Sequence, residues 1–153
     1  MLSARWLLPV VLVTSASATS APSLKLQLMP LDPADRVADS GGCTISLGPK
    51  DNHVFSSTEG LLGASVLKVD GERFTLKVVR SKDTANASQP AVGDQSFVEY
   101  RAGKLEVRID YRVSATCSPN AGDCGEPAHL ATITLRKDGA TRTYRSLPAG
   151  CGC

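Results

Sequence analysis

The sequence predicts an all-β protein: a small antiparallel β-barrel or β-sandwich built of hairpins, with at most one short helix near the mature N-terminus. Two observations indicate this fold class. Apolar and polar residues alternate strictly from Leu105 to Ala115, as in a strand with one buried and one solvated face. Asp-Gly pairs at 70–71 and 138–139 lie between further alternating stretches, and such pairs favour two-residue hairpin turns. The 153 residues are enough for one domain.

The stretch before Cys43 predicts one strand and one short helix. Leucines alternate with polar residues over 24–28, which is typical of a strand. Asp32-Pro33-Ala34-Asp35 offers an N-cap residue, a proline at the first helical position and an early acid. Gly41-Gly42 then ends the helix. A helix of only two turns is not stable alone, so we expect it to pack against the rest of the domain.

The remainder of the chain predicts a series of short strands. We expect them over residues 44–47, 54–56, 64–69, 73–79, 96–100, 104–116, 129–136 and 141–146. The hairpin turns predict Leu67 opposite Phe74 and Ile133 opposite Tyr144. Residues 81–93 lack periodicity and are expected to form a long loop. Antiparallel strands of this kind must close as a barrel or pack as a sandwich to bury their apolar faces.

Residues 1–18 predict a cleavable signal peptide. Arg5 is the only charge before Lys25, and the apolar stretch behind it is too short to span a bilayer. Ala16-Ser17-Ala18 fits a signal-peptidase site, so we expect the mature chain to begin at Thr19. The mature protein is then secreted or periplasmic and lacks a transmembrane segment. Residues 19–42 are the N-terminal strand with a short helix or linker, and 43–153 the β domain.

All five cysteines fall in this exported part, where disulfides persist. We expect Cys117 to pair with Cys124 across a loop, and Cys43 to pair with Cys151 or Cys153. One thiol is then left over. The alternative hypothesis is a thiol redox or soft-metal site built on Cys151-Gly152-Cys153.

Catalytic and metal-binding motifs are absent from the sequence. Residues 65–68 match the S-x-x-K motif, in which a helix brings the lysine close to the serine. Here the segment is a predicted strand, and residues three apart on a strand point to opposite faces, so Lys68 cannot assist Ser65. Six residues separate Cys117 from Cys124, where zinc ligands have two to four, and neither His53 nor His129 has a second histidine near it. We therefore assign no catalytic residue, metal or cofactor. A hydrolase whose site assembles from distant strands is a less favoured alternative.

The charge pattern offers one candidate binding face, while the export signal, the β pattern and the missing catalytic motifs favour a binding protein. Seventeen basic and fifteen acidic residues give a net charge of +2, which is too small an excess for nucleic-acid binding. Positive residues gather on the last hairpins, and the candidate binding face comprises Arg108, Arg112, Arg142 and Arg145. The plain alternative is a solvated face with cross-strand ion pairs. We expect an exported, disulfide-stabilised, non-catalytic domain that binds an envelope or extracellular partner, such as an anionic glycan, a cell-wall polymer or an acidic protein.

Overall fold

The computed structural model describes residues 25–37, 44–49, 52–58, 61–83, 91–115 and 128–152. Those residues form nine strands and one turn of 3-10 helix. The elements are β1 (Leu28–Met29), η1 (Pro33–Asp35), β2 (Thr44–Leu47), β3 (Phe55–Ser57), β4 (Ser65–Val69), β5 (Glu72–Asp83), β6 (Gln95–Ala102), β7 (Leu105–Ala115), β8 (Ala128–Lys137) and β9 (Ala140–Gly152). No helix in the described part is long and apolar enough to cross a membrane.

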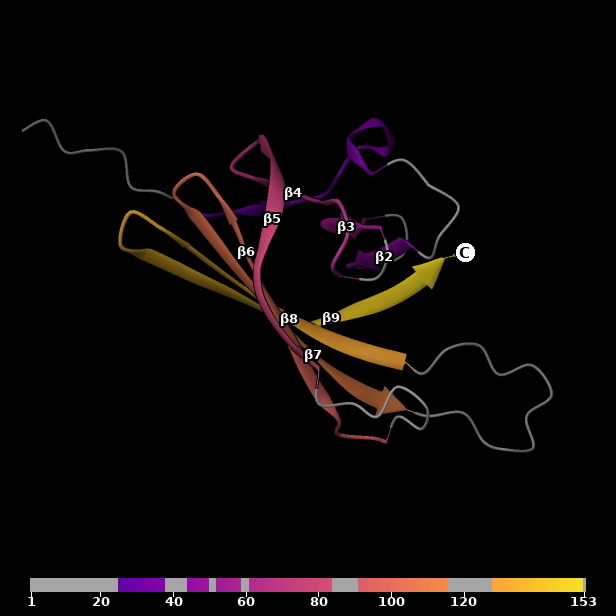
Figure 1. Ribbon diagram of the computed structural model, residues 1–153. Helices are drawn as coiled ribbons and strands as arrows, with labels where there is room; N and C mark the ends of the chain where they lie inside the picture. Colours follow the sequence, from indigo (N-terminus) through magenta and orange to yellow (C-terminus); the bar gives the residue numbers. More distant parts are fainter. Residues whose placement is uncertain are drawn as a thin grey trace, which may run out of the picture.

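Strands β2 to β9 form an antiparallel barrel in which each strand pairs with its neighbours in sequence (Figure 1). The barrel closes where β9 pairs with β2, and the extra strand β1 pairs with β4. The predicted all-β class is therefore confirmed, and of the two predicted architectures the protein adopts the barrel. Closure removes most of the unpaired strand edges that an open sheet would carry.

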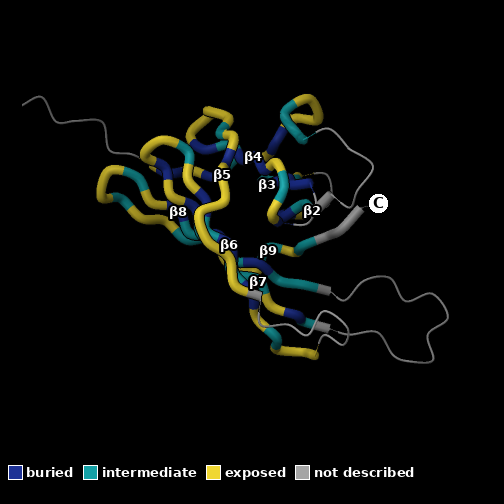
Figure 2. Tube along the Cα trace, in the orientation of Figure 1, coloured by how far each residue is buried: buried dark blue, intermediate teal, exposed yellow. Residues whose placement is uncertain are grey.

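The buried apolar residues of the barrel strands form one core cluster, and Figure 2 marks the buried positions along the tube. Ile109 and Ile133 lie opposite each other on β7 and β8, and both are fully buried. Tyr100 donates a hydrogen bond of 2.6 Å to the Leu61 carbonyl, and burial raises the pKa of its phenol. The prediction of Ile109 in the core is confirmed. Tyr111, predicted beside it, is only half-buried.

The predicted hairpin registers are confirmed. Leu67 lies opposite Phe74, and Ile133 lies opposite Tyr144. Both residues of each Asp-Gly turn have positive φ, for example 51° at Asp70 and 87° at Gly71. Glycine, and to a lesser degree asparagine and aspartate, adopt positive φ with little strain. In the β6–β7 hairpin Ala102 pairs with Leu105, so the turn lies one residue later than the predicted 101–103.

Two strands extend far beyond their predicted ends. β5 runs to Asp83, into the predicted loop, because its second half pairs with β6. β9 runs to Gly152 because its last residues pair with β2. Both extensions come from pairing with other strands, which local periodicity does not reveal.

The N-terminal segment forms a strand only at Leu28–Met29, paired with β4, which is shorter and later than the strand predicted over 24–28. Leu26 has a φ of 47° and interrupts any extended run, yet its side chain is buried. The Asp70 carboxylate accepts hydrogen bonds from the backbone N–H groups of Leu26 and Gln27 at 3.0 and 2.8 Å. The predicted helix is a 3-10 turn whose Asp32 makes no cap and instead pairs with Lys68 at 2.9 Å.

Tyr144 ties this segment to β9, and its removal gives a first prediction. Its hydroxyl donates to the Leu26 carbonyl and accepts from the Leu28 N–H, both at 2.8 Å. Tyr144→Phe is expected to destabilise the segment by about 1–2 kcal/mol, because both backbone groups lose their partner. Hydrogen exchange should therefore accelerate over residues 25–31 and stay unchanged in β7. Unchanged exchange over residues 25–31 contradicts this role of the hydroxyl.

Candidate functional site

The outward side chains of β5 to β9 form rows across the sheet. In one row Lys82 lies opposite Phe97, Phe97 opposite Asp110, and Asp110 opposite Thr132. A hollow of about 490 Å³ lies on this face, and we call it the outer groove. Its lining includes Lys82, Gln95, Phe97, Arg108, Asp110, Arg112, Leu130, Thr132 and Ser146.

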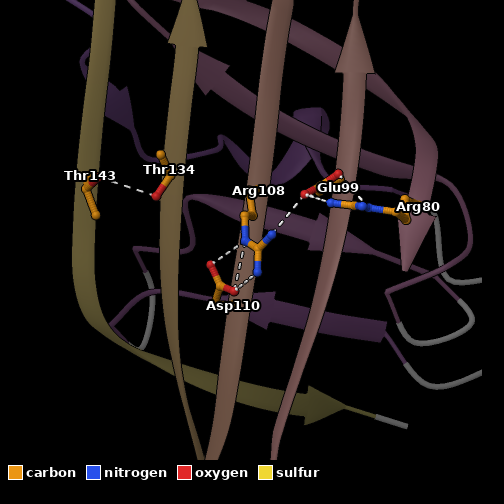
Figure 3. Close-up of polar contacts among 6 residues, drawn as sticks. All are labelled: Arg80, Glu99, Arg108, Asp110, Thr134 and Thr143. Carbon is orange, nitrogen blue, oxygen red and sulfur yellow. Dashed lines mark hydrogen bonds and ion pairs between the residues drawn. The ribbon is translucent and has the colours of Figure 1, made fainter. Parts of the chain in front are cut away.

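An ion-pair network borders the outer groove (Figure 3). Arg108 donates to both carboxylate oxygens of Asp110 at 2.7–2.9 Å and to Glu99 at 2.9 Å. Arg80 donates two hydrogen bonds to Glu99, at 2.9 and 3.1 Å. Two cations and two anions therefore compensate each other. Arg108 and Asp110, expected to be freely exposed, are partly buried in this network.

The network is charged at neutral pH. Hydrogen bonds from Arg80, and then from Arg108, lower the pKa of Glu99 against the opposing effect of desolvation. The hydrogen bond to Asp110 raises the pKa of Arg108. Because the pKa of folded Glu99 is lowered, its contribution to stability is present at neutral pH and is lost as the pH falls through that pKa.

Phe97 forms the aromatic part of the groove wall. The guanidinium carbon of Arg108 lies 4.1 Å from the ring centroid, and that of Arg80 lies at 5.3 Å. This stacking fixes the arginine against the ring in addition to its ion pairs. Arg108 is therefore a rigid part of the wall, with little freedom to reach for a ligand.

Lys82 and Arg112 supply the uncompensated charge. Both are exposed and line the outer groove, and no carboxylate in the described part of the chain pairs with either. Gln95 lies opposite Arg112 and adds an amide, while Leu130 adds an apolar surface. A hollow with two cations, neutral hydrogen-bonding groups and apolar surface suits an anionic ligand.

The four arginines of the predicted binding face do not all lie together. Arg108 and Arg112 line the outer groove. Arg145 is exposed on β9, within the irregular pairing between β8 and β9. Arg142 lies opposite buried Leu135 and donates to the Lys25 carbonyl at 3.0 Å, so it holds the N-terminal segment.

Sequence reasoning missed Lys82 and Phe97. Phe97 alternates with Ser96 and Val98 in a predicted strand, so its outward position was available from the pattern. Lys82 stood in a stretch without periodicity, and only its pairing with β6 brings it to the groove.

The remaining candidates give no catalytic arrangement among the described residues. Ser65 is buried with its hydroxyl 2.7 Å from that of Ser57, while Lys68 pairs with Asp32 elsewhere. No group of three or more His, Cys, Asp or Glu side chains in the described ranges is placed to hold a metal ion.

The cysteine predictions fall outside the described side chains. Cys43, Cys117, Cys124 and Cys153 lie outside the described residues. For Cys151 the backbone alone is described, in β9 opposite Ile45. The expected disulfides and the alternative redox site therefore remain predictions.

Comparison with known proteins finds no matching family model, no similar curated protein and no similar solved structure.

Proposed function

We propose that this chain is an exported, non-catalytic binding protein that holds an anionic ligand in the outer groove. One observation carries the proposal: Lys82 and Arg112 have no carboxylate partner among the described residues, and they lie in a groove whose other charged groups neutralise one another. The signal peptide and the disulfides belong to the same proposal, because they suit a domain that works at the envelope or outside the cell.

The groove is suited to binding because its wall is fixed before a ligand arrives. Arg108 is held by Asp110, Glu99 and the Phe97 ring. A ligand therefore orders few side chains besides Lys82 and Arg112, which lowers the entropic cost of binding. Arg112 presents a guanidinium fork to a carboxylate or sulfate, and Lys82 adds a point charge across the sheet.

Binding of polyanions tests the proposal. The mature protein from Thr19 is titrated with a labelled polyuronate and with labelled polyglutamate at low ionic strength. The double variant Lys82→Gln/Arg112→Gln is expected to bind at least about tenfold more weakly, a loss of about 1.4 kcal/mol. Binding by the unaltered protein should weaken as salt is added, since the contacts are exposed.

The matched control is Lys25→Gln/Arg136→Gln, which removes two exposed cations without touching the outer groove. Its affinity should stay close to that of the unaltered protein. An equal loss in both double variants indicates attraction by net charge alone and overturns the proposal. Absence of binding to both polymers also overturns it.

A further inference from the structure

Strand β5 changes partner along its length. Residues 72–76 pair with β4, whereas Lys77–Asp83 pair with β6 on the other edge. No strand in the described part of the chain pairs with the β4-side edge of Lys77–Asp83. Figure 1 shows β5 continuing well past the end of β4. This stretch, which we call the open edge, therefore presents backbone N–H and C=O groups that another strand can bind.

The open edge is accessible over its whole described surface. Residues 77–82 are all exposed, as the tube in Figure 2 shows along β5. Val78 is 38% exposed and Val79 57%, although valine normally packs into a core. The register shifts between Val78 and Arg80, so one valine is an extra residue in the strand. The exposed valines lie beside a strand edge whose backbone groups an added strand can bind.

The same register shift gathers positive charge on one face. Lys77, Arg80 and Lys82 lie opposite Arg101, Glu99 and Phe97, which are alternate residues of β6 and so share its outer face. Arg80 is paired with Glu99, whereas Lys77 and Lys82 have no ion-pair partner among the described residues.

The charge selects the kind of strand that fits. Residues 77–83 carry three basic residues and one acidic residue. A second copy of this edge would bring the same positive excess against it, and such lysine-bearing edges disfavour self-association. A strand with carboxylates at alternate positions complements Lys77 and Lys82, which have no ion-pair partner among the described residues.

We propose that the open edge accepts an extended acidic segment of a partner protein as an added β-strand. This inference rests on the proposed function and names its ligand as a polypeptide. The backbone groups of the open edge bind the segment, as in other cases of strand addition. Lys77 and Lys82 bind its alternate carboxylates, and Val79 contacts an apolar side chain between them. Lys82 also lines the outer groove, so the two surfaces are continuous.

The test compares two nine-residue peptides of alternating Glu and Val, both labelled, on the full mature protein. One peptide has ordinary amides, and the other is N-methylated at every residue, so that neither of its edges offers an N–H group. Both carry the same charge, but only the first can join a sheet. We expect the N-methylated peptide to bind at least about tenfold more weakly, and the ordinary peptide to slow hydrogen exchange over residues 77–83.

Two protein variants locate the binding. Lys77→Gln/Lys82→Gln should weaken binding of the ordinary peptide at least about tenfold, and Lys25→Gln/Arg136→Gln should not. Equal binding of the two peptides overturns the inference, since charge alone then explains it. A dimer of the free protein with residues 77–83 protected from exchange overturns it as well. If the polyuronate binds through Arg112 and neither peptide binds, the proposed function stands and the strand-addition inference fails.

Discussion

Ile109→Ala is expected to lower the free energy of unfolding by about 2–4 kcal/mol. Ile109 is fully buried and lies between Val98 on β6 and Ile133 on β8. Truncation removes apolar contacts and leaves a cavity, because the surrounding strands are held by their backbone ladders and collapse little. Urea denaturation measures the change as a lower midpoint at an unchanged slope.

Arg108→Ala is the control from the same strand. Strict alternation alone predicts a cost below about 0.5 kcal/mol for an exposed side chain. The observed network raises the expected cost to about 0.5–1 kcal/mol, since Arg108 joins Glu99 and Asp110 at a partly solvated surface. Added salt should reduce this cost and leave that of Ile109→Ala unchanged. Equal midpoint shifts in the two variants contradict the assignment of inner and outer faces.

The parts of the fold that the sequence predicted correctly are those with local causes. The Asp70-Gly71 and Asp138-Gly139 turns fix positive φ at both positions, and this sets the register of each hairpin. Alternation along β7 then assigned Ile109 to the barrel interior and Arg112 to the surface. These predictions needed only neighbours in sequence.

The parts that the sequence missed depend on distant partners. β9 continues to Gly152 because it meets Thr44, more than a hundred residues earlier. The residues around Leu26 leave the extended conformation, and the Asp70 carboxylate binds their N–H groups. The alternation of apolar and polar residues within one strand carries no information about either of these contacts.

Irregular pairing explains the errors at the candidate site. The shift between Val78 and Arg80 brings Lys82 to the outer face from a predicted loop. The shift between Ala131 and Ile133, with Ser146 at a φ of 56°, changes which residues of β9 face outward. Arg142 and Arg145 therefore have different surroundings, although both were assigned to one face. Bulges leave no reliable mark in the alternation of apolar and polar residues.

A disulfide between Cys43 and Cys153 is the last expected result. The described register of β2 and β9 runs from Leu47 opposite Ala149 to Thr44 opposite Gly152. Cys43 and Cys153 are the next residues in each direction, so the same register predicts that they are opposite. Opposite residues of antiparallel strands have Cα atoms about 4.5–5.5 Å apart, within the range of about 4.4–6.8 Å that a disulfide needs.

Cys151 fits less well as the partner of Cys43. It lies opposite Ile45, and a diagonal pair of this kind is about 7–8 Å apart. We therefore narrow the sequence-based expectation to Cys43–Cys153, with Cys117–Cys124 as the second bond and Cys151 as the free thiol. A bond that joins the first and last strands of the barrel closes a loop of more than a hundred residues. The loop-entropy estimate for such a loop is at most about 4.8 kcal/mol.

Non-reducing peptide mapping with thiol alkylation identifies the bonds, and urea denaturation measures their effect. Cys153→Ser should cost several kcal/mol, up to the loop-entropy limit of about 4.8 kcal/mol. Cys151→Ser should cost less than about 0.5 kcal/mol because it removes only a free thiol. Reductant should remove the difference between Cys153→Ser and the unaltered protein. A Cys151–Cys153 bond with Cys43 alkylated contradicts the register argument, and it favours the redox hypothesis for the Cys-Gly-Cys tail because so small a ring is strained and readily reduced.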